Sequence, residues 1–114
     1  MRLAFSLILL AVAMPALAMH CELDGVEVNT DNGATTAGKT GMLRCYRPDG
    51  KLQREQALRQ GDYLGLDRRY DDDGSVRERQ VNARGNTEGR ATETYPTGRL
   101  KSEGNFSDGS AVGL

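Results

Sequence analysis

The sequence predicts an all-β protein, built as a single-layer antiparallel meander of stacked β-hairpins. Its glycines recur with a 24-residue period, each period contains two turn sequences, and the stretches between the turns are short, with mixed polar and apolar alternation. One hairpin alone is barely stable in water, whereas stacked hairpins bury a shared face. The glycines on this lattice, ten of the 14 in the chain, form three columns: Gly41, Gly65, Gly89 and Gly113; Gly50, Gly74 and Gly98; and Gly61, Gly85 and Gly109.

Residues 1–18 have the parts of a secretory signal peptide. Arg2 supplies a positive charge, and the apolar run that follows is too short to cross a bilayer and leads to a small-x-small stretch that closes at Ala18. Cleavage near Ala18 predicts a periplasmic or secreted bacterial protein, for which a membrane is not an expected partner. The alternatives are a retained anchor and a lipoprotein attached through Cys21, although His20 is not the small residue that lipoprotein processing requires there.

The remaining chain is long enough for one domain with a small core. Residues 19–40 are predicted to form a degenerate first unit that caps the array. Three regular units follow, at 41–64, 65–88 and 89–112. Each is predicted to be a hairpin, because "RPDGK", "DDDGS" and "YPTGR" place Pro or Asp ahead of a glycine that can take positive φ.

The third unit contains "TYPTGRLKSEGNFSDGS", in which a tyrosine, a glycine turn, Lys-Ser-Glu-Gly, an aromatic residue and a second glycine turn follow one another. This order resembles the bacterial variant of the MORN repeat (membrane occupation and recognition nexus). The first two units match less closely, because "QREQ" and "RERQ" replace the Lys-Ser-Glu-Gly core. The resemblance implies stacked hairpins and an antitoxin-like or immunity-like function. The positions that carry it are Tyr95, Gly98, Leu100, Lys101, Ser102, Glu103, Gly104, Phe106 and Gly109.

The stretch "GATTAGKT", residues 33–40, fits the phosphate-binding consensus G-x-x-x-x-G-K-[ST]. A phosphate loop needs a buried strand before it and a helix after it. Here the preceding "VEVNTDN" ends in turn formers, Gly41 follows at once, and Pro48 leaves no room for an amphipathic helix. We therefore expect a loop of the first unit and no nucleotide.

Catalytic and metal chemistry are not expected either. His20 is the only histidine, and the serines lie in or near turns without a recognisable nucleophile elbow, so no catalytic triad is indicated. One histidine with two cysteines is a poor zinc site. The acids of Asp71–Gly74 are consecutive, which favours a solvated turn over a calcium loop, whose ligands alternate. A formal net charge of −1 argues against nucleic acid as a partner. The sequence predicts no enzyme and no cofactor.

Cys21 and Cys45 are separated by one 24-residue period. An even pair in an oxidising compartment favours a disulfide. Equivalent positions in successive hairpins, however, lie two strands apart, about 9.5 Å, whereas bonded cysteines need Cα atoms within about 7 Å. The bond therefore requires that the irregular first unit shift its register, and two free thiols are the alternative.

A one-layer sheet exposes two faces, and here both are rich in Arg, Glu, Asp and Gln. We expect a protein-binding module whose partner is a charged protein, such as a toxin or effector. The alternatives are a structural or envelope-associated protein that binds peptidoglycan, lipid or a membrane partner, and a homo-oligomer formed through an open C-terminal edge. The candidate contact residues, which otherwise serve as solvated or packing side chains, are Arg44, Tyr46, Arg54, Arg68, Tyr70, Arg77, Arg79, Tyr95 and Arg99.

Overall fold

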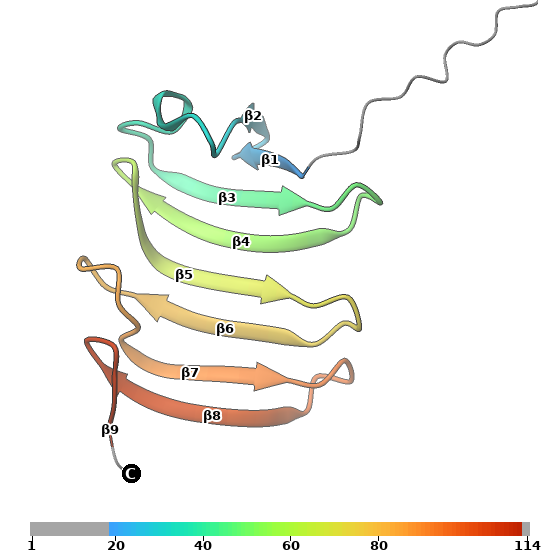
Figure 1. The fold of residues 1–114 in the computed structure, drawn as a ribbon, viewed down its shortest axis with the longest axis vertical. Coiled ribbons are helices and arrows are strands. Elements are labelled where there is room, and N and C mark those ends of the chain that lie inside the picture. Colours follow the sequence, from blue (N-terminus) through green and yellow to red (C-terminus); the bar gives the residue numbers. More distant parts are fainter. Residues whose placement is uncertain (1–18, 113–114) are drawn as a thin grey trace, which may run out of the picture.

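The computed structural model describes residues 19–112 and confirms the predicted fold class (Figure 1). These residues form one open antiparallel sheet of nine strands without an α-helix. The predicted signal peptide and Gly113 lie outside the described residues. The strands are β1 (His20–Leu23), β2 (Val26–Val28), β3 (Gly41–Tyr46), β4 (Leu52–Arg59), β5 (Asp62–Tyr70), β6 (Val76–Val81), β7 (Gly89–Thr94), β8 (Leu100–Ser107) and β9 (Ser110–Val112).

The turns at one end of the sheet repeat with the 24-residue period. In each, the amide of the first residue donates to the carbonyl oxygen four residues later, and the amide of the lattice glycine donates back to the first carbonyl oxygen. All the lattice glycines in the described part of the chain have positive φ, between 79° and 156°. Other residue types adopt such a backbone only at a cost, which explains the regular glycines. The three turns are Arg47–Lys51, Asp71–Ser75 and Tyr95–Arg99.

The N-terminal unit is the one departure from a simple meander. The strand order is β2-β1-β3 and then onward in sequence, so β1 pairs directly with β3, and β2 lies at the outer edge. Cys21 is therefore the register partner of Cys45, with their Cα atoms 4.0 Å apart, and the two are joined by a disulfide. The expected two-strand separation was wrong, because no strand lies between β1 and β3.

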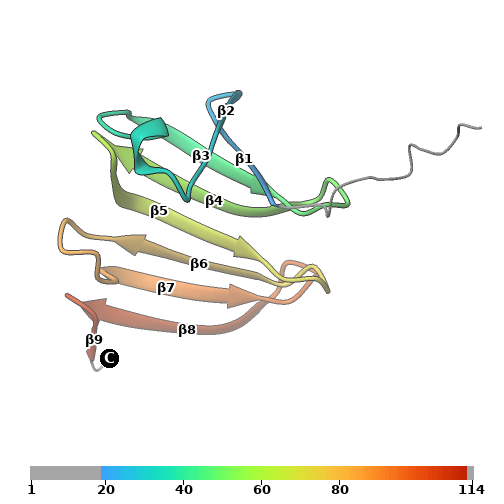
Figure 2. The same cartoon turned by 45° about the horizontal axis from the view of Figure 1, so that its top comes forward.

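The apolar core lies under the β1–β2 hairpin, which folds over β3 at the N-terminal end of the sheet (Figure 2). Leu43 is fully buried at its centre. Strand pairing alone would leave this face open to water, and the β1–β2 hairpin, which we call the cap, covers it. The core residues are Cys21, Leu23, Val28, Leu43, Cys45 and Leu58.

Residues 33–40 form a loop that packs on the β4–β5 turn. The Gly61 amide donates to the carbonyl oxygen of Lys39 at 2.8 Å, and the Gln60 amide donates to the hydroxyl of Thr40 at 2.9 Å. A Cβ atom added at Gly61 would lie 2.8 Å from a backbone nitrogen of the loop. Strand β3, rather than a helix, follows the loop. Lys39 and Thr40 thus hold a neighbouring turn in place.

The two faces of the sheet differ in chemistry. Cross-strand partners share a face, and the pairs Cys45–Arg54, Arg54–Arg69 and Arg69–Arg77 run from the apolar core across β6. We call the face that carries these residues the core face, and the other the opposite face. The core face is therefore apolar under the cap and charged beyond it.

The change from apolar to charged residues along the core face can be seen at a single position of the repeat. Leu43, Asp67 and Ala91 occupy the same position in successive units, and Asp67 is as buried as the core, at 3% exposure. The hairpin cap covers only the first unit. Beyond it the positions equivalent to Leu43 are filled by the polar Asp67 and the small Ala91.

The C-terminal edge consists of β8 and the short β9, which pair over Asn105–Ser107. Association of copies through this edge stays a prediction.

Candidate functional site

A groove of about 600 Å³ lies on the core face over β5 to β8. Its floor is the sheet itself, and its charged walls come from side chains of β5, β6 and β7. Glu78 and Glu103 border it but point by register to the opposite face. We call it the arginine groove, and its lining residues are Asp67, Arg69, Arg77, Glu78, Arg79, Ala91, Thr92, Glu93, Ser102, Glu103, Gly104 and Phe106.

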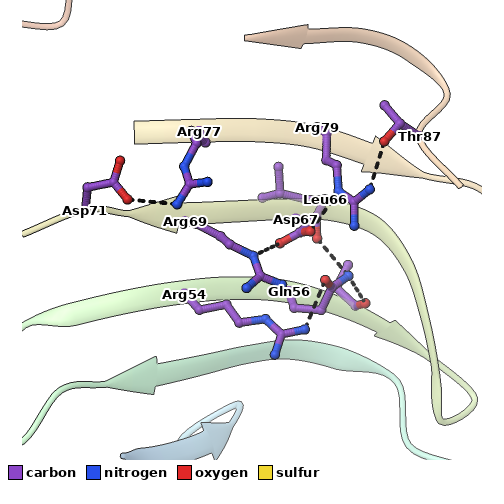
Figure 3. Close-up of polar contacts among 10 residues, drawn as sticks. Arg54, Gln56, Leu66, Asp67, Arg69, Asp71, Arg77, Arg79 and Thr87 are labelled. Atoms are coloured by element: carbon purple, nitrogen blue, oxygen red, sulfur yellow. Dashed lines mark hydrogen bonds and ion pairs between the residues drawn. The ribbon is translucent and has the colours of Figure 1, made fainter. Parts of the chain in front are cut away.

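Asp67, a buried acid on β5, lies on the β5 side of the groove (Figure 3). One carboxylate oxygen accepts from Nε of Arg79 at 2.9 Å, and the other accepts from Nε of Arg69 at 3.3 Å. Arg79 also donates through Nη1 to the Thr87 hydroxyl at 2.8 Å. A buried charge needs such partners to be tolerated. Asp67 therefore holds two guanidinium groups in place, one on β5 and one on β6.

Gln56 lies between Asp67 and the apolar core, as the register partner of Asp67 on one side and of Leu43 on the other. It is 2% exposed, and its Nε2 donates to the carbonyl oxygens of Ala57 and Leu66, both at 3.1 Å. Its Oε1 accepts from Nη2 of Arg54 at 3.5 Å. The Arg54 guanidinium also lies 5.0 Å from the centre of the Tyr63 ring, within range of a cation–π contact. Arg54 thus forms the end of the charged surface nearest the core.

Three arginines occupy consecutive register positions on β4, β5 and β6, namely Arg54, Arg69 and Arg77. Like charges placed directly opposite each other destabilise a sheet. The side chains of Arg69 and Arg77 are 48% and 57% exposed, and that of Arg79 is 42% exposed. Guanidinium groups arranged in this way can donate paired hydrogen bonds to carboxylates.

The far wall of the groove is neutral and partly apolar. Ala91 and Gly104 are register partners on β7 and β8. A Cβ atom at Gly104 would lie 3.1 Å from Cε1 of Phe106, so the aromatic ring rests against this glycine. Glu93, the acid on this side, forms an ion pair with Lys101 at 3.4 Å. The positive charge of the arginines is therefore concentrated on β5 and β6.

The opposite face carries a separate network around Glu55, which is 8% exposed. One oxygen of Glu55 accepts from the Tyr70 hydroxyl at 2.7 Å and from Nη1 of Arg68 at 3.0 Å. The other oxygen accepts from Nε of Arg44 at 3.0 Å. Arg68 continues the network through Nε to Glu78 at 2.8 Å. These bonds tie β3, β4, β5 and β6 together.

The network shifts the pKa values of its members. Burial raises the pKa of Glu55, but the hydrogen bonds from Tyr70, Arg68 and Arg44 together outweigh burial and lower it. Burial, followed by the hydrogen bond to Glu55, raises the pKa of Tyr70. The hydrogen bond to Glu78 is the main cause that raises the pKa of Arg68. The network is therefore stable in its charged form, with Glu55 ionised.

We expect the Glu55→Gln variant to lose about 1–3 kcal/mol of unfolding free energy at pH 7, because two cations lose a charged acceptor. A lowered folded-state pKa contributes stability above the ordinary value of 4.5, and this stability is lost as the pH falls through the folded pKa. Urea denaturation from pH 7 to about pH 3 should therefore show a shallower acid decline for the variant than for the wild type.

The matched control for this prediction is Glu103→Gln. Glu103 pairs with Arg90 on the same face, but it is 44% exposed, so the change should be below about 0.5 kcal/mol. Equal losses in the two variants, or an undiminished acid decline in Glu55→Gln, would contradict the role assigned to Glu55.

The nine predicted contact residues fall into three groups. Tyr95 and Arg99 lie apart from the others in the β7–β8 turn, where the Arg99 guanidinium is 5.8 Å from the centre of the Tyr95 ring. Arg54, Arg77 and Arg79 lie together on the core face. The opposite face holds the remaining four, which are Arg44, Tyr46, Arg68 and Tyr70.

Sequence reasoning missed Asp67, Arg69 and Phe106. A signal for Arg69 exists, because it occupies the same repeat position as Cys45. A disulfide at Cys45 marks that position as inward-facing, and side chains of equivalent positions share a face. Phe106 was named only for its place in the MORN-type motif, and that motif does not indicate that the ring lines a groove.

The described residues also bear on metal binding, membrane spanning and the redox environment of the protein. Within residues 19–112, no group of three or more His, Cys, Asp or Glu side chains is placed to hold a metal ion. The same part of the chain contains no helix that is long and apolar enough to cross a membrane. The Cys21–Cys45 disulfide indicates an oxidising, extracytoplasmic environment.

Comparisons of the chain with protein-family models, with curated proteins and with solved structures give no match.

Proposed function

We propose that the chain is a periplasmic protein-binding repeat module, and that it serves as an immunity protein or antitoxin that neutralises a secreted toxin. The arginine groove carries this proposal, because it offers accessible guanidinium groups on a preformed surface. The resemblance to bacterial MORN-type repeats and the extracytoplasmic disulfide support it.

The construction of the groove suits a protein partner. Its arginines belong to strands rather than to loops, and hydrogen bonds to Asp67 hold Arg69 and Arg79 in place. Side chains that are held in place before binding lose less entropy on association. Arginine and aromatic residues are enriched at protein interfaces, and Phe106 lies beside the charged residues.

The experiment that tests this function is deletion of the gene in its native host, with and without the neighbouring gene for a secreted toxin. We expect the deletion to impair growth only when the toxin is produced, and we expect the plasmid-borne chain to restore growth. Normal growth of the deletion strain in the presence of every co-encoded secreted effector would refute the immunity function.

A second candidate function is association with the cell envelope, which one surface cluster favours. Tyr95 and Leu100 are 42% and 46% exposed at the β7–β8 end, and the charged groups of Arg99 and Lys101 each lie 5.8 Å from the Tyr95 ring centre. Aromatic rings flanked by cations suit a boundary between polar and apolar phases. Envelope defects in the deletion strain that do not depend on any toxin would favour this candidate.

A further inference from the structure

Resting on the proposed function, we propose that the arginine groove binds an extended acidic segment of the partner protein. The segment lies along β6 and carries carboxylate side chains on alternate residues, which face Arg77 and Arg79. Arg69, the register neighbour of Arg77 on β5, contacts the same carboxylate as Arg77.

The spacing of the arginines matches an extended peptide. Arg77 and Arg79 are two residues apart on β6 and share the core face, so their backbones are separated by about 6.8 Å. Alternate side chains of an extended ligand repeat at the same distance. Arg69 lies one strand away, about 4.8 Å, which places two guanidinium groups around one carboxylate.

The three guanidinium groups keep donors for a ligand. Each arginine has five N–H groups. In the bonds made within residues 19–112, Arg69 uses Nε, Arg77 uses Nη2, and Arg79 uses Nε and Nη1. Their terminal nitrogens therefore supply the paired donors that a carboxylate accepts.

The charge balance of the groove calls for an anionic ligand. Asp67 compensates Arg69 and Arg79 but does not contact Arg77, whose acid, Asp71, belongs to an exposed turn. Glu93, the other acid of this face, is paired with Lys101. A carboxylate bound between Arg69 and Arg77 would neutralise two like charges that face each other in register.

The two-residue spacing favours a peptide over a glycan. A strand-like ligand above β6 would place its backbone beside the neutral wall formed by Ala91, Gly104 and Phe106, with its remaining side chains directed away from the sheet. Peptidoglycan fragments also carry carboxylates, so they form a separate arm of the test.

The test uses the oxidised chain and a short synthetic peptide that alternates Glu and Thr, with affinity measured by calorimetric titration. We expect binding that weakens steeply as ionic strength rises from about 0.01 M to about 1 M, because screening shortens from about 30 Å to 3 Å. Arg77→Gln should weaken binding by about tenfold or more, since a charge-assisted hydrogen bond is lost.

The control variant is Arg90→Gln. Arg90 has nearly the same side-chain exposure as Arg77, 59% against 57%, but lies on the opposite face. It should leave the affinity unchanged. The thermal midpoints of both variants should stay within about 2 °C of the wild type, because only exposed ion pairs are lost. Lost binding in Arg77→Gln is then not a folding defect.

Three outcomes would overturn the proposal: equal losses in the two variants, equal binding of a peptide that alternates Lys and Thr, or preferential binding of a muropeptide. The growth experiment separates this proposal from the immunity function. If Arg77→Gln protects the host as well as the wild type does, the groove proposal fails and the immunity function stands. If the deletion strain resists its toxins while the acidic peptide still binds, the immunity function fails and the groove proposal stands.

Discussion

Replacing both Cys21 and Cys45 by alanine is expected to lower the free energy of unfolding by about 3.5 kcal/mol. The disulfide spans a sequence separation of 24 residues, and closing a loop of this length restricts the unfolded chain by about that amount. The loss is a large fraction of the 5–15 kcal/mol or so that stabilises a typical domain. Because β1 pairs with β3 over only four positions, we also expect β1 and β2 to open more readily without the disulfide.

Urea denaturation of the oxidised wild type, the reduced wild type and the alanine variant measures this effect. The reduced wild type should approach the variant, and the variant itself should be insensitive to reductant. Hydrogen exchange should show β1 and β2 opening first. A wild-type midpoint that does not change on reduction would show that the disulfide does not stabilise the fold.

The Leu43→Ala variant is expected to lose about 2–5 kcal/mol, as large-to-small changes in a packed core do. Leu43 has no exposed surface and lies between the two cysteines and the other apolar residues of the capped end. Residues 19–112 contain no second apolar cluster of comparable burial, so no other part of the described sheet offsets the loss of packing at Leu43.

Leu100→Ala is the matched control, because it removes the same atoms from a side chain that is 46% exposed. Its effect should stay within about 0.5 kcal/mol. Both variants are measured by the same denaturation experiment. Similar losses at the two positions would mean that the cap does not enclose the main core.

The regular part of the fold could be predicted because glycine has a local reason to recur. A turn that needs positive φ selects glycine wherever it occurs, so Gly50, Gly74 and Gly98 mark three turns with the same hydrogen bonds. This signal does not depend on what the strands pack against. It therefore survives in the sequence even where the strands themselves diverge.

The cap and the groove could not be predicted in the same way, because both depend on contacts between distant residues. The position of β1 next to β3 follows from burying Leu23 against Leu43, and no local pattern distinguishes this arrangement from β2 next to β3. The burial of Asp67 was missed for a similar reason, since its partner Arg79 comes from the next strand, β6.

Because the same turn hydrogen bonds recur at fixed intervals, whole units can be added to or removed from this sheet without changing its strand order. Each strand is hydrogen-bonded only to the strands beside it, so a duplicated segment 65–88 would extend the sheet by two strands and leave the disulfide-bonded end untouched. Evolution can lengthen or shorten such a chain in whole modules, and the two faces of the sheet would grow or shrink in the same steps.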